Sequence, residues 1–570
     1  MRALGAFALE YMTAKGGDET LARKSNAAGA KRLVAKLAAT LREDPNPAAR
    51  RGAAAAIGAM PAALLLAPIE VDSDSAAEGE AEAEPSSGVA PPRGQKTSPA
   101  WRVALDALRV ASVPEEDPEA RDAEARVCAV RGMAGALETL EKARMDAGGE
   151  AGSDSGGTDS AALAHAVLDF ARETIASLLT CVAEDYCVDN RGDVGSWVRE
   201  AAMETLPAAL AAAQAARAPA DAETEREVVA ALLKQAAEKI DRTRATAATA
   251  LAAVLRGRPE RTLAPLLLAP ARDALLVAAP ETETSAASWA APATAFERLA
   301  PLLDATSDDA PLAKYRASLV EGFVVSAGGV GDSLGRAAGG ALVARLKAGG
   351  LGLQTAVAEE LCAVLERRQG CDRVTIPLLR VLDLCFSSGA FAAVAPAPPA
   401  PPAPFAARLA KGLRTELRGS RDVAKLCLGV QALCHLAALG AEERAEEGEG
   451  ESAARENPPA RELATHALLA LLVNRYPRVR RVAAEQLYVT LLGMDGDEYG
   501  GDAEAAAELL SDTRWDAELA VVKPARNELY PLLGLVAPAN ATAAPKGKGV
   551  AAAATDENES YAALVGSAGY

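Results

Sequence analysis

Aromatic residues are scarce in this chain: they make up only 4 % of its 570 residues, although half of all residues are hydrophobic. Because alanine dominates that hydrophobic half, the composition favours many small, repetitive helix–helix contacts over one large globular core. The chain also lacks any apolar run near the roughly 18–20 residues that span a bilayer. Its N-terminus has neither the apolar core nor the cleavage site of a signal peptide. We therefore expect a soluble, cytoplasmic protein without membrane insertion.

Groups that commonly carry out catalysis are also few. The chain has three histidines, His165, His435 and His466, and no two of them have a metal-ligand spacing. Its eight cysteines match neither a CxxC zinc pattern nor a compact disulfide framework, which indicates free, mostly buried thiols. No GxxxxGK[ST] phosphate loop occurs, and "GVGDSLG" from Gly329 has GxGxxxG spacing, which favours a helix–helix turn. We expect no catalytic residue, cofactor or metal, and so a binding protein rather than an enzyme.

Positive charge is in deficit: 60 Lys and Arg face 78 Asp and Glu, which gives a net charge of −18. Two low-complexity stretches, Asp72–Glu84 and Glu442–Glu456, carry 11 of these 18 net charges, so the rest of the chain is only mildly acidic. A nucleic-acid-binding protein would have a concentrated basic face, and we expect no nucleic-acid partner. We interpret the acidic runs as solvated insertions.

Low-complexity segments divide an otherwise helical sequence, and none has the apolar content to offset the entropy of ordering its backbone. Between them, Ala, Leu, Glu and Arg recur with a 3.6-residue period and without a sustained period of two, which predicts an all-α protein. The predicted helical segments are 1–71, 100–145, 161–393, 405–440 and 460–537. The predicted disordered segments are the acidic and Pro/Ser-rich 72–99, 146–160, the Pro-rich linker 394–404, the acidic 441–459 and the tail 538–570.

Four segments share a repeat, in which a turn with Pro or Asp is followed by an arginine and then by apolar residues at helical spacing. Aligning the segments places Arg50, Arg199, Arg244 and Arg480 at equivalent positions. Arg199 and Arg244 are 45 residues apart, and Arg244 and Arg480 are 236 apart, or about five units of 47. This period is typical of HEAT and armadillo helix pairs, so we predict a helical-repeat solenoid with disordered insertions.

The stretch Val188–Leu206 illustrates one repeat. Val198, Ala202 and Leu206 recur at i, i+4 and i+8, so they are predicted to face the core, with Arg199 beside them in a structural position. We assign the same structural role to Arg244, Arg480 and Trp515.

The same stretch contains an Arg-Gly-Asp triplet, which would be an adhesion ligand only on an exported protein. Gly192 is expected to supply a turn, and Asp193 to stabilise the free N–H groups of the next helix, so we interpret the triplet as a coincidence. Trp197 is expected to be buried, so that Trp197→Ala would lower the free energy of unfolding by about 3–5 kcal/mol.

Several stretches go beyond the generic repeat and resemble the tubulin-folding cofactor D family, in the family's order. They are "DNRGDVGSWVREAAM" (189–203), "QAAEKIDRTRATAA" (235–248), "SWAAPATAFERLAPLL" (288–303), "YRASLVEGFVVSAGGVGDSL" (315–334), "YPRVRRVAAEQLYVTLL" (476–492) and "LLSDTRWDAELAVVKPARNELYPLLGL" (509–535), with "RRGAAAAIGAMPAALL" (50–65) before them. Family members are much longer. The chain is therefore expected to correspond to their C-terminal half and to begin within the solenoid, with 161–393 resembling the family's C-terminal domain.

The resemblance implies a chaperone that binds β-tubulin after the cytosolic chaperonin and joins cofactors C and E to assemble the α/β-tubulin heterodimer. It also implies that the chain binds a small Arf-like GTPase and activates GTP hydrolysis by tubulin only within a cofactor complex. The family has no catalytic site of its own, and the implied location is the cytoplasm, at microtubules or centrosomes. Two alternatives remain from the residues alone: a generic HEAT-repeat scaffold for another assembly, and a nucleotide hydrolase.

Tubulin is strongly acidic, as is this chain, so association would require local basic and apolar patches. Two arginine-rich segments are the predicted partner-binding sites. The first, "RYPRVRR", contributes Arg475, Arg478 and Arg481. The second, "LRTELRGSRDVAK", contributes Arg414, Arg418, Arg421 and Lys425, which one continuous helix would place largely on one side. The competing interpretation of the second segment is a solvated face on which Glu416 and Asp422 pair with these bases.

Overall fold

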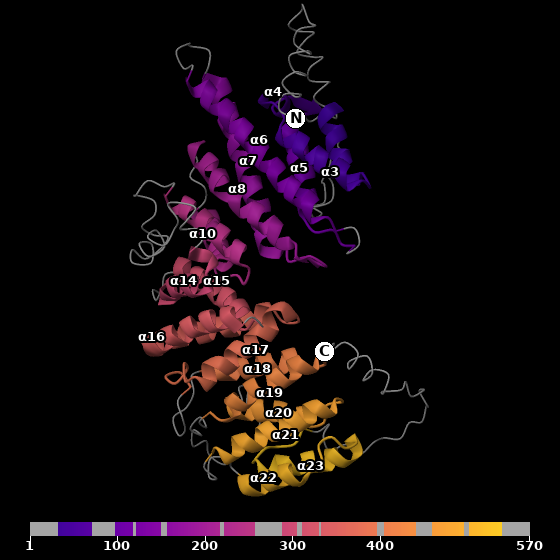
Figure 1. Cartoon of the computed structure of the whole chain (residues 1–570), viewed down its shortest axis with the longest axis vertical. Coiled ribbons are helices and arrows are strands. Elements are labelled where there is room, and N and C mark those ends of the chain that lie inside the picture. The colour runs from indigo at the N-terminus through magenta and orange to yellow at the C-terminus, as the bar shows by residue number, and fades with distance from the viewer. Residues whose placement is uncertain are drawn as a thin grey trace, which may run out of the picture. The chain divides into compact units, whose positions relative to one another are not determined.

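The computed structural model describes residues 32–70, 97–117, 121–149, 157–216, 222–256, 288–304, 310–329, 332–395, 404–439, 459–494 and 501–538. The predicted insertions 72–99, 146–160, 394–404 and 441–459, and the tail 538–570, lie largely outside these residues. The described residues divide into two compact units, with unit 1 ending at Gly419 and unit 2 starting at Ser420. Helices dominate both units (Figure 1).

Unit 1 begins with a helix over residues 32–43. It continues with α3 (Pro47–Gly58), α4 (Ala62–Leu65), α5 (Ala100–Ser112), α6 (Ala123–Gly149), α7 (Gly157–Glu184), α8 (Gly195–Ala215), α9 (Ala222–Ala236), α10 (Asp241–Arg256), α14 (Pro292–Leu299), a 3-10 turn (Ala300–Asp304), α15 (Ala310–Ala327), α16 (Asp332–Arg367), α17 (Asp372–Ser387) and α18 (Phe405–Leu417). Unit 2 contains α19 (Val423–Ala437), α20 (Ala460–Leu471), α21 (Pro477–Leu492), α22 (Ala503–Asp512) and α23 (Leu519–Leu532). Within the described ranges, no helix combines the length and apolarity that crossing a bilayer requires.

Two very short antiparallel strand pairs occur among the described residues. β1 (Pro68–Glu70) pairs with β2 (Thr97–Pro99), and Pro68 lies opposite Pro99. β3 (Val188–Asp189) pairs with β4 (Gly192–Asp193), and Val188 lies opposite Asp193. Both pairs connect helices and leave the all-α character of the fold unchanged.

The helices of unit 1 pack in two rows. One row runs through α3, α6, α8 and α10, and the other through α5, α7, α9, α15 and α17. Successive helices such as α7 and α8 also pack against each other, and Figure 1 shows α6, α7 and α8 side by side. Each helix therefore buries one face on its pair mate and another on the next repeat, because no pair can cover its own apolar stripe. The prediction of an all-α helical-repeat fold is confirmed.

The core of these repeats is built from small and branched residues. Val198, Ala202 and Leu206 on α8 have no exposed surface, as their spacing predicts. Glycine allows the closest approach: a Cβ at Gly135 of α6 would lie 2.5 Å from the carbonyl oxygen of Gly58 on α3. A side chain at that position would push the two backbones apart.

The repeat arginines are buried and hold successive turns together. Arg244 has no exposed surface, and its guanidinium donates to the carbonyls of Glu238 and Lys239 in its own turn. It also donates to the carbonyls of Trp289 and Ala290 in the next turn. A guanidinium has five N–H donors in a fixed plane, so one side chain can tie two turns at once.

Arg480 repeats this arrangement in unit 2. It is 3 % exposed and donates to the carbonyls of Asn474 and Arg475, six and five residues before it. It also donates to the carbonyls of residues Trp515, Asp516 and Ala517. The equivalence of Arg244 and Arg480 is thus visible in the contacts as well as in the spacing.

Two other buried arginines, Arg199 and Arg126, form ion pairs with carboxylates. Arg199, with no exposed surface, lies 3.1 Å from the Asp193 carboxylate and donates to the Asp185 carbonyl. Arg126, which the alignment omits, is also fully buried, and its Nε lies 2.8 Å from the Asp185 carboxylate. Arg50, which the alignment includes, is only half-buried. Arg126 and Arg199 therefore meet at Asp185 and join α6 to α8 through the end of α7.

A buried glutamate ties three helices within unit 1. Glu321 on α15 is 5 % exposed, and its carboxylate lies 2.8 Å from Lys234 of α9 and 2.9 Å from Arg368 after α16. Burial alone would raise the pKa of this carboxyl, but the charges and hydrogen bonds of Lys234 and Arg368 outweigh burial and lower the pKa. The charged form of Glu321 thus stabilises the fold.

We expect Arg480→Ala to lower the free energy of unfolding by about 2–4 kcal/mol, because buried carbonyls in two turns lose their donors. The neighbouring Arg481 is the matched control: it is exposed, so Arg481→Ala should change stability by no more than about 0.5 kcal/mol. Urea unfolding followed by circular dichroism measures both values. Equal effects of the two substitutions would contradict the structural role of Arg480.

We expect Glu321→Gln to cost about 1–3 kcal/mol at pH 7, because Lys234 and Arg368 lose a charged acceptor. The native pKa of Glu321 lies below its ordinary value of 4.5, so the ionised form contributes stability above that value. This contribution is lost as the pH falls through the native pKa. The difference in unfolding free energy between the wild type and the variant should stay constant from pH 7 to about 5 and then shrink. A difference independent of pH down to acid unfolding would rule out the charged contact.

Candidate partner-binding surfaces

The first predicted basic segment lies at the start of α21. Arg475, Arg478 and Arg481 are all exposed, whereas Arg480 between them is buried. Pro477 begins the helix, and its fixed φ suits the first helical position. Arg478 and Arg481 are three residues apart and so share one face, while Arg480 lies on the opposite side and contacts the turns. The segment therefore divides into a structural arginine and three that face solvent.

These exposed arginines have only weak partners. The Arg475 guanidinium lies over the Tyr476 ring, 4.5 Å from its centroid. Arg481 lies 3.4 Å from Glu485, but both side chains are more than 60 % exposed. Exposed pairs of this kind contribute about 0–1 kcal/mol and leave both charges accessible. The positive charge of this surface remains available to a partner.

A fourth exposed arginine lies on a neighbouring turn. Arg480 bonds the turn at Asn474 and the turn at Trp515, so these two turns lie next to each other. Arg514 precedes Trp515, is 84 % exposed and lies 3.8 Å from the Asp516 carboxylate. We call Arg475, Arg478 and Arg481 the α21 basic cluster. The sequence analysis misses Arg514, and the only signal for it is its position beside Trp515, a residue that the resemblance already singles out.

The second predicted basic segment is divided between two helices. The helix predicted across it is wrong: α18 ends at Leu417, Gly419 adopts φ 74°, and α19 begins at Val423. Glycine reaches this left-handed region without the steric cost that other residues carry, so the helix stops there. Arg414 and Arg418 belong to unit 1.

The rest of this segment belongs to unit 2. Arg421 is exposed there, whereas the Lys425 side chain is only 4 % exposed and offers little surface to a partner. The two acids of the segment also bond to backbone N–H groups. Glu416 accepts a hydrogen bond from the Gly370 N–H, and Asp422 caps α19 by accepting from the Lys425 N–H.

The Arg-Gly-Asp triplet (191–193) lies in the β3–β4 hairpin before α8. Gly192 has φ 104° in the turn, and the Asp193 carboxylate accepts a hydrogen bond from the Ser196 N–H at the start of α8. Arg191 lies 2.7 Å from Asp189 and 3.3 Å from Glu124. The roles predicted for Gly192 and Asp193 are confirmed, and the triplet belongs to the joint between α7 and α8.

Trp197 on α8 is half-buried, so the prediction of a fully buried ring is wrong. The Arg191 guanidinium lies over the ring, 4.9 Å from its centroid. The remaining ring surface lines a shallow groove of about 530 Å³ on α6, α8 and α10, together with Arg131, Glu204 and Arg242. A partly exposed Trp beside Arg is a combination enriched in protein interfaces, which makes this groove a second candidate surface.

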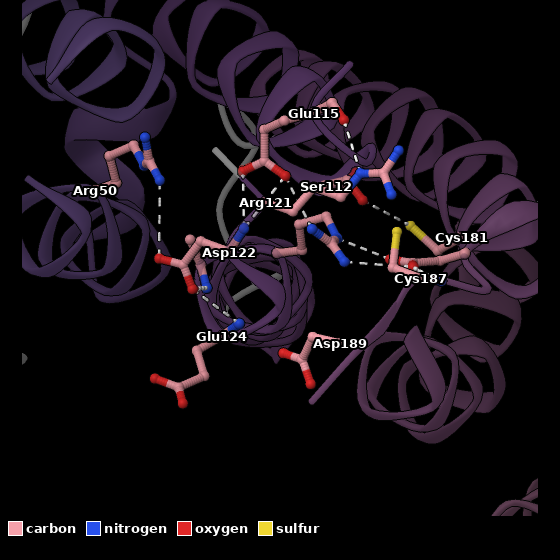
Figure 2. A network of polar contacts seen from close by, with 12 residues as sticks. Arg50, Ser112, Glu115, Arg121, Asp122, Glu124, Cys181, Cys187 and Asp189 are labelled. Atoms are coloured by element: carbon pink, nitrogen blue, oxygen red, sulfur yellow. Dashed lines mark hydrogen bonds and ion pairs between the residues drawn. The ribbon is translucent and has the colours of Figure 1, made fainter. Parts of the chain in front are cut away.

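A polar network lies at the joint between α5, α6 and α7 (Figure 2). The Glu115 carboxylate accepts from the Arg126 guanidinium at 2.9 Å, and Arg126 in turn pairs with Asp185. Asp122 caps α6 and lies 2.8 Å from Arg51. Burial alone would raise the pKa of the Asp122 carboxyl, but the Arg51 guanidinium and the Ala125 N–H hold it below its ordinary value. Each of these groups is occupied by a neighbour in the joint, so the network stabilises the fold.

Two observations bear on nucleophilic and metal-binding chemistry: the state of a buried thiol and the placement of possible metal ligands. Burial raises the pKa of the Cys181 thiol to about 11, and its Sγ donates to the Ser112 carbonyl at 3.7 Å. A thiol with so high a pKa is protonated and unreactive at neutral pH. In the part of the chain that the structure describes, no three His, Cys, Asp or Glu side chains are placed to hold a metal ion.

Trp515 is 4 % exposed, and its indole N–H donates to the Leu510 carbonyl at 2.9 Å. Its own carbonyl accepts from Arg480. The ring therefore fills the core of unit 2 while its backbone completes the arginine contact.

Residues 226–425 match the family described as tubulin folding cofactor D C terminal. The match spans 200 of the 570 residues, from α9 to the start of α19, and includes Arg244 and Glu321. Three of the stretches that resemble the cofactor D family, 235–248, 288–303 and 315–334, lie inside it. The resemblance to the C-terminal half of cofactor D is confirmed for this region, whereas α21 and Trp197 lie outside the match, which the groove beside Trp197 enters only through α10.

We expect Trp515→Ala to lower the free energy of unfolding by about 3–5 kcal/mol, because a buried ring leaves a cavity. Trp197→Ala should cost only about 1–2 kcal/mol, because its ring is partly exposed to water already. Urea unfolding of the two variants against the wild type measures both values. A larger loss for Trp197 than for Trp515 would contradict their placement.

Proposed function

We propose that this chain is a tubulin-folding chaperone that binds β-tubulin and takes part in assembly of the α/β-tubulin heterodimer after the chaperonin step. The observation that carries this proposal is the match of residues 226–425 to the cofactor D C-terminal family. The helical-repeat fold supports it, because rows of stacked helices offer extended surfaces to a large protein partner.

The proposed partners besides β-tubulin are cofactors C and E and a small Arf-like GTPase. Within their complex the chain would activate GTP hydrolysis by tubulin, with the catalytic groups supplied by the other components. This division of labour agrees with the surfaces described above, whose arginines are suited to hold a partner rather than to react. Such a chaperone would work in the cytoplasm, at microtubules or centrosomes.

We assign part of the β-tubulin contact to the α21 basic cluster. Tubulin and this chain are both acidic, so their long-range interaction is repulsive, and attraction must come from local basic surface. Arg475, Arg478 and Arg481 offer such a surface, because they are exposed and only weakly paired. Arginine also binds carboxylates through two parallel hydrogen bonds, which fixes geometry as well as charge.

The first experiment is capture of purified β-tubulin by the immobilised chain, with and without cofactors C and E. We expect wild-type chain to retain tubulin, and Arg478→Glu/Arg481→Glu to weaken retention about tenfold, since two favourable contacts become repulsive. Lys347→Glu/Arg367→Glu, a matched reversal of two exposed bases on α16, is the control and should bind as the wild type does.

Failure of the wild type to retain tubulin under all these conditions would overturn the proposed function. Recovery of a different assembly from cell extract, without tubulin or its cofactors, would favour a generic helical-repeat scaffold. Retention unchanged by the α21 reversal would leave the function standing and remove the basic cluster from the contact.

A further inference from the structure

The exposed face of α21 carries one continuous stripe with two chemical characters. Arg478, Arg481, Glu485, Val489 and Leu492 follow one another at i, i+3, i+7, i+11 and i+14, and all five are exposed. At 100° per residue these positions lie within about 80° of each other around the helix. The stripe is therefore basic at its start and apolar at its end.

The apolar end is unusual for a solvent-facing surface. Val489 is 60 % exposed and Leu492 is 64 % exposed. A single exposed aliphatic side chain is ordinary, but two at helical spacing beside a charged cluster form a surface that a partner can cover. With a rise of 1.5 Å per residue, they lie about 16–21 Å from Arg478 along the axis, which corresponds to three to four turns of a partner helix.

The orientation of this stripe is fixed from behind. Val479, Arg480, Ala483 and Leu487 are buried on the opposite side of α21, and Arg480 is bound to two turns. Rotation of the helix would expose these residues and bury charges, so the stripe is held outward. A surface fixed in this way loses little conformational entropy when a partner binds.

We propose that the α21 stripe docks an amphipathic segment of the protein partner, with carboxylates at one end of its contact face and large apolar side chains at the other. The carboxylates would bind Arg478 and Arg481 and be drawn further by Arg475, and the apolar residues would cover Val489 and Leu492. That the docked segment belongs to the chaperone's client rests on the proposed function. The docking of such a segment on the α21 stripe does not depend on that function.

Charge and shape favour a peptide over a nucleic acid as occupant. The basic end lies at the N-terminus of α21, where the helix dipole adds positive potential that attracts carboxylates. The apolar end offers nothing to a phosphate backbone. A long polyanion would also meet the repulsion of a chain with net charge −18, whereas a short segment with an uncharged half largely avoids it.

The two ends of the stripe would contribute differently. Exposed ion pairs are individually weak, so the arginines would mainly set the orientation of the segment and speed its association. The apolar end would supply most of the affinity, because it removes Val489 and Leu492 from water. A segment that is only acidic or only apolar should therefore bind worse than one with both parts in the right spacing.

The test uses the full chain and fluorescein-labelled synthetic 18-residue helical peptides, with binding followed by fluorescence anisotropy. One probe carries three glutamates in its first two turns and three leucines on the same face in its last two turns; a second has the reverse order. A third probe has the same composition in scrambled order. We expect one of the two ordered probes to bind at least tenfold more tightly than the scrambled probe.

Two variants locate the binding. Arg478→Glu/Arg481→Glu and Val489→Ser/Leu492→Ser should each weaken the ordered probe about tenfold, while Lys347→Glu/Arg367→Glu on α16 leaves it unchanged. All of these positions are exposed, and unchanged circular dichroism melts confirm that the variants fold. If only the arginine variant loses binding, and the scrambled probe binds as well as the ordered one, the proposal that both ends of the stripe contribute is overturned.

Binding of neither ordered probe above the scrambled one would also overturn the inference, as would full competition by a single-stranded oligothymidylate, which would point to a nucleic acid instead. These results remain separate from the tubulin capture. If tubulin is retained and no probe binds, only this inference is overturned. If a probe binds and no tubulin is retained, only the proposed function is overturned.

Discussion

The buried guanidinium of each repeat arginine is the contact on which the rest of this fold depends. Taking an arginine out of water is costly, and the cost is offset only if its N–H groups meet fixed acceptors. Arg244 and Arg480 find these acceptors in backbone carbonyls of two successive turns. The carbonyls must be held in place for this, so the turns, and the helices that leave them, are set in a defined register.

That register also determines what the surface presents. Because Arg480 points into the turns, the helical period directs Arg478 and Arg481 to the opposite side of α21. The same guanidinium brings the turn of Arg475 next to that of Arg514, so two exposed arginines from distant segments lie on adjacent turns. The joint at Asp185 acts similarly in unit 1, where Arg126 and Arg199 fix the hairpin that carries Arg191 against Trp197. Structural arginines thus position the exposed ones.

Features that depend on local spacing could be predicted from the sequence. The core positions of α8 and the burial of Arg199, Arg244 and Arg480 follow from helical periodicity and the repeat length. Features that depend on contacts between distant segments could not. Arg126 was missed because long insertions break the repeat interval around it, and Arg514 because only the contact through Arg480 brings it near Arg475. The degree to which Trp197 is covered likewise depends on how closely α6 and α10 approach α8, which no local pattern encodes.

The predicted helix over 414–425 failed for a different reason. Its charged residues fit one helical face, but periodicity is a weaker constraint than the backbone freedom of Gly419, which allows the chain to turn between two units. The consequence is functional as well as structural. Under the proposed function, an acidic chain holds an acidic client, which requires basic residues that are both concentrated and fixed. The α21 cluster satisfies both, and Val489 and Leu492 add contacts that charge repulsion does not weaken. Selectivity then arises because a uniformly acidic surface gains only the arginine contacts and still meets the net repulsion, whereas a mixed segment gains both kinds of contact.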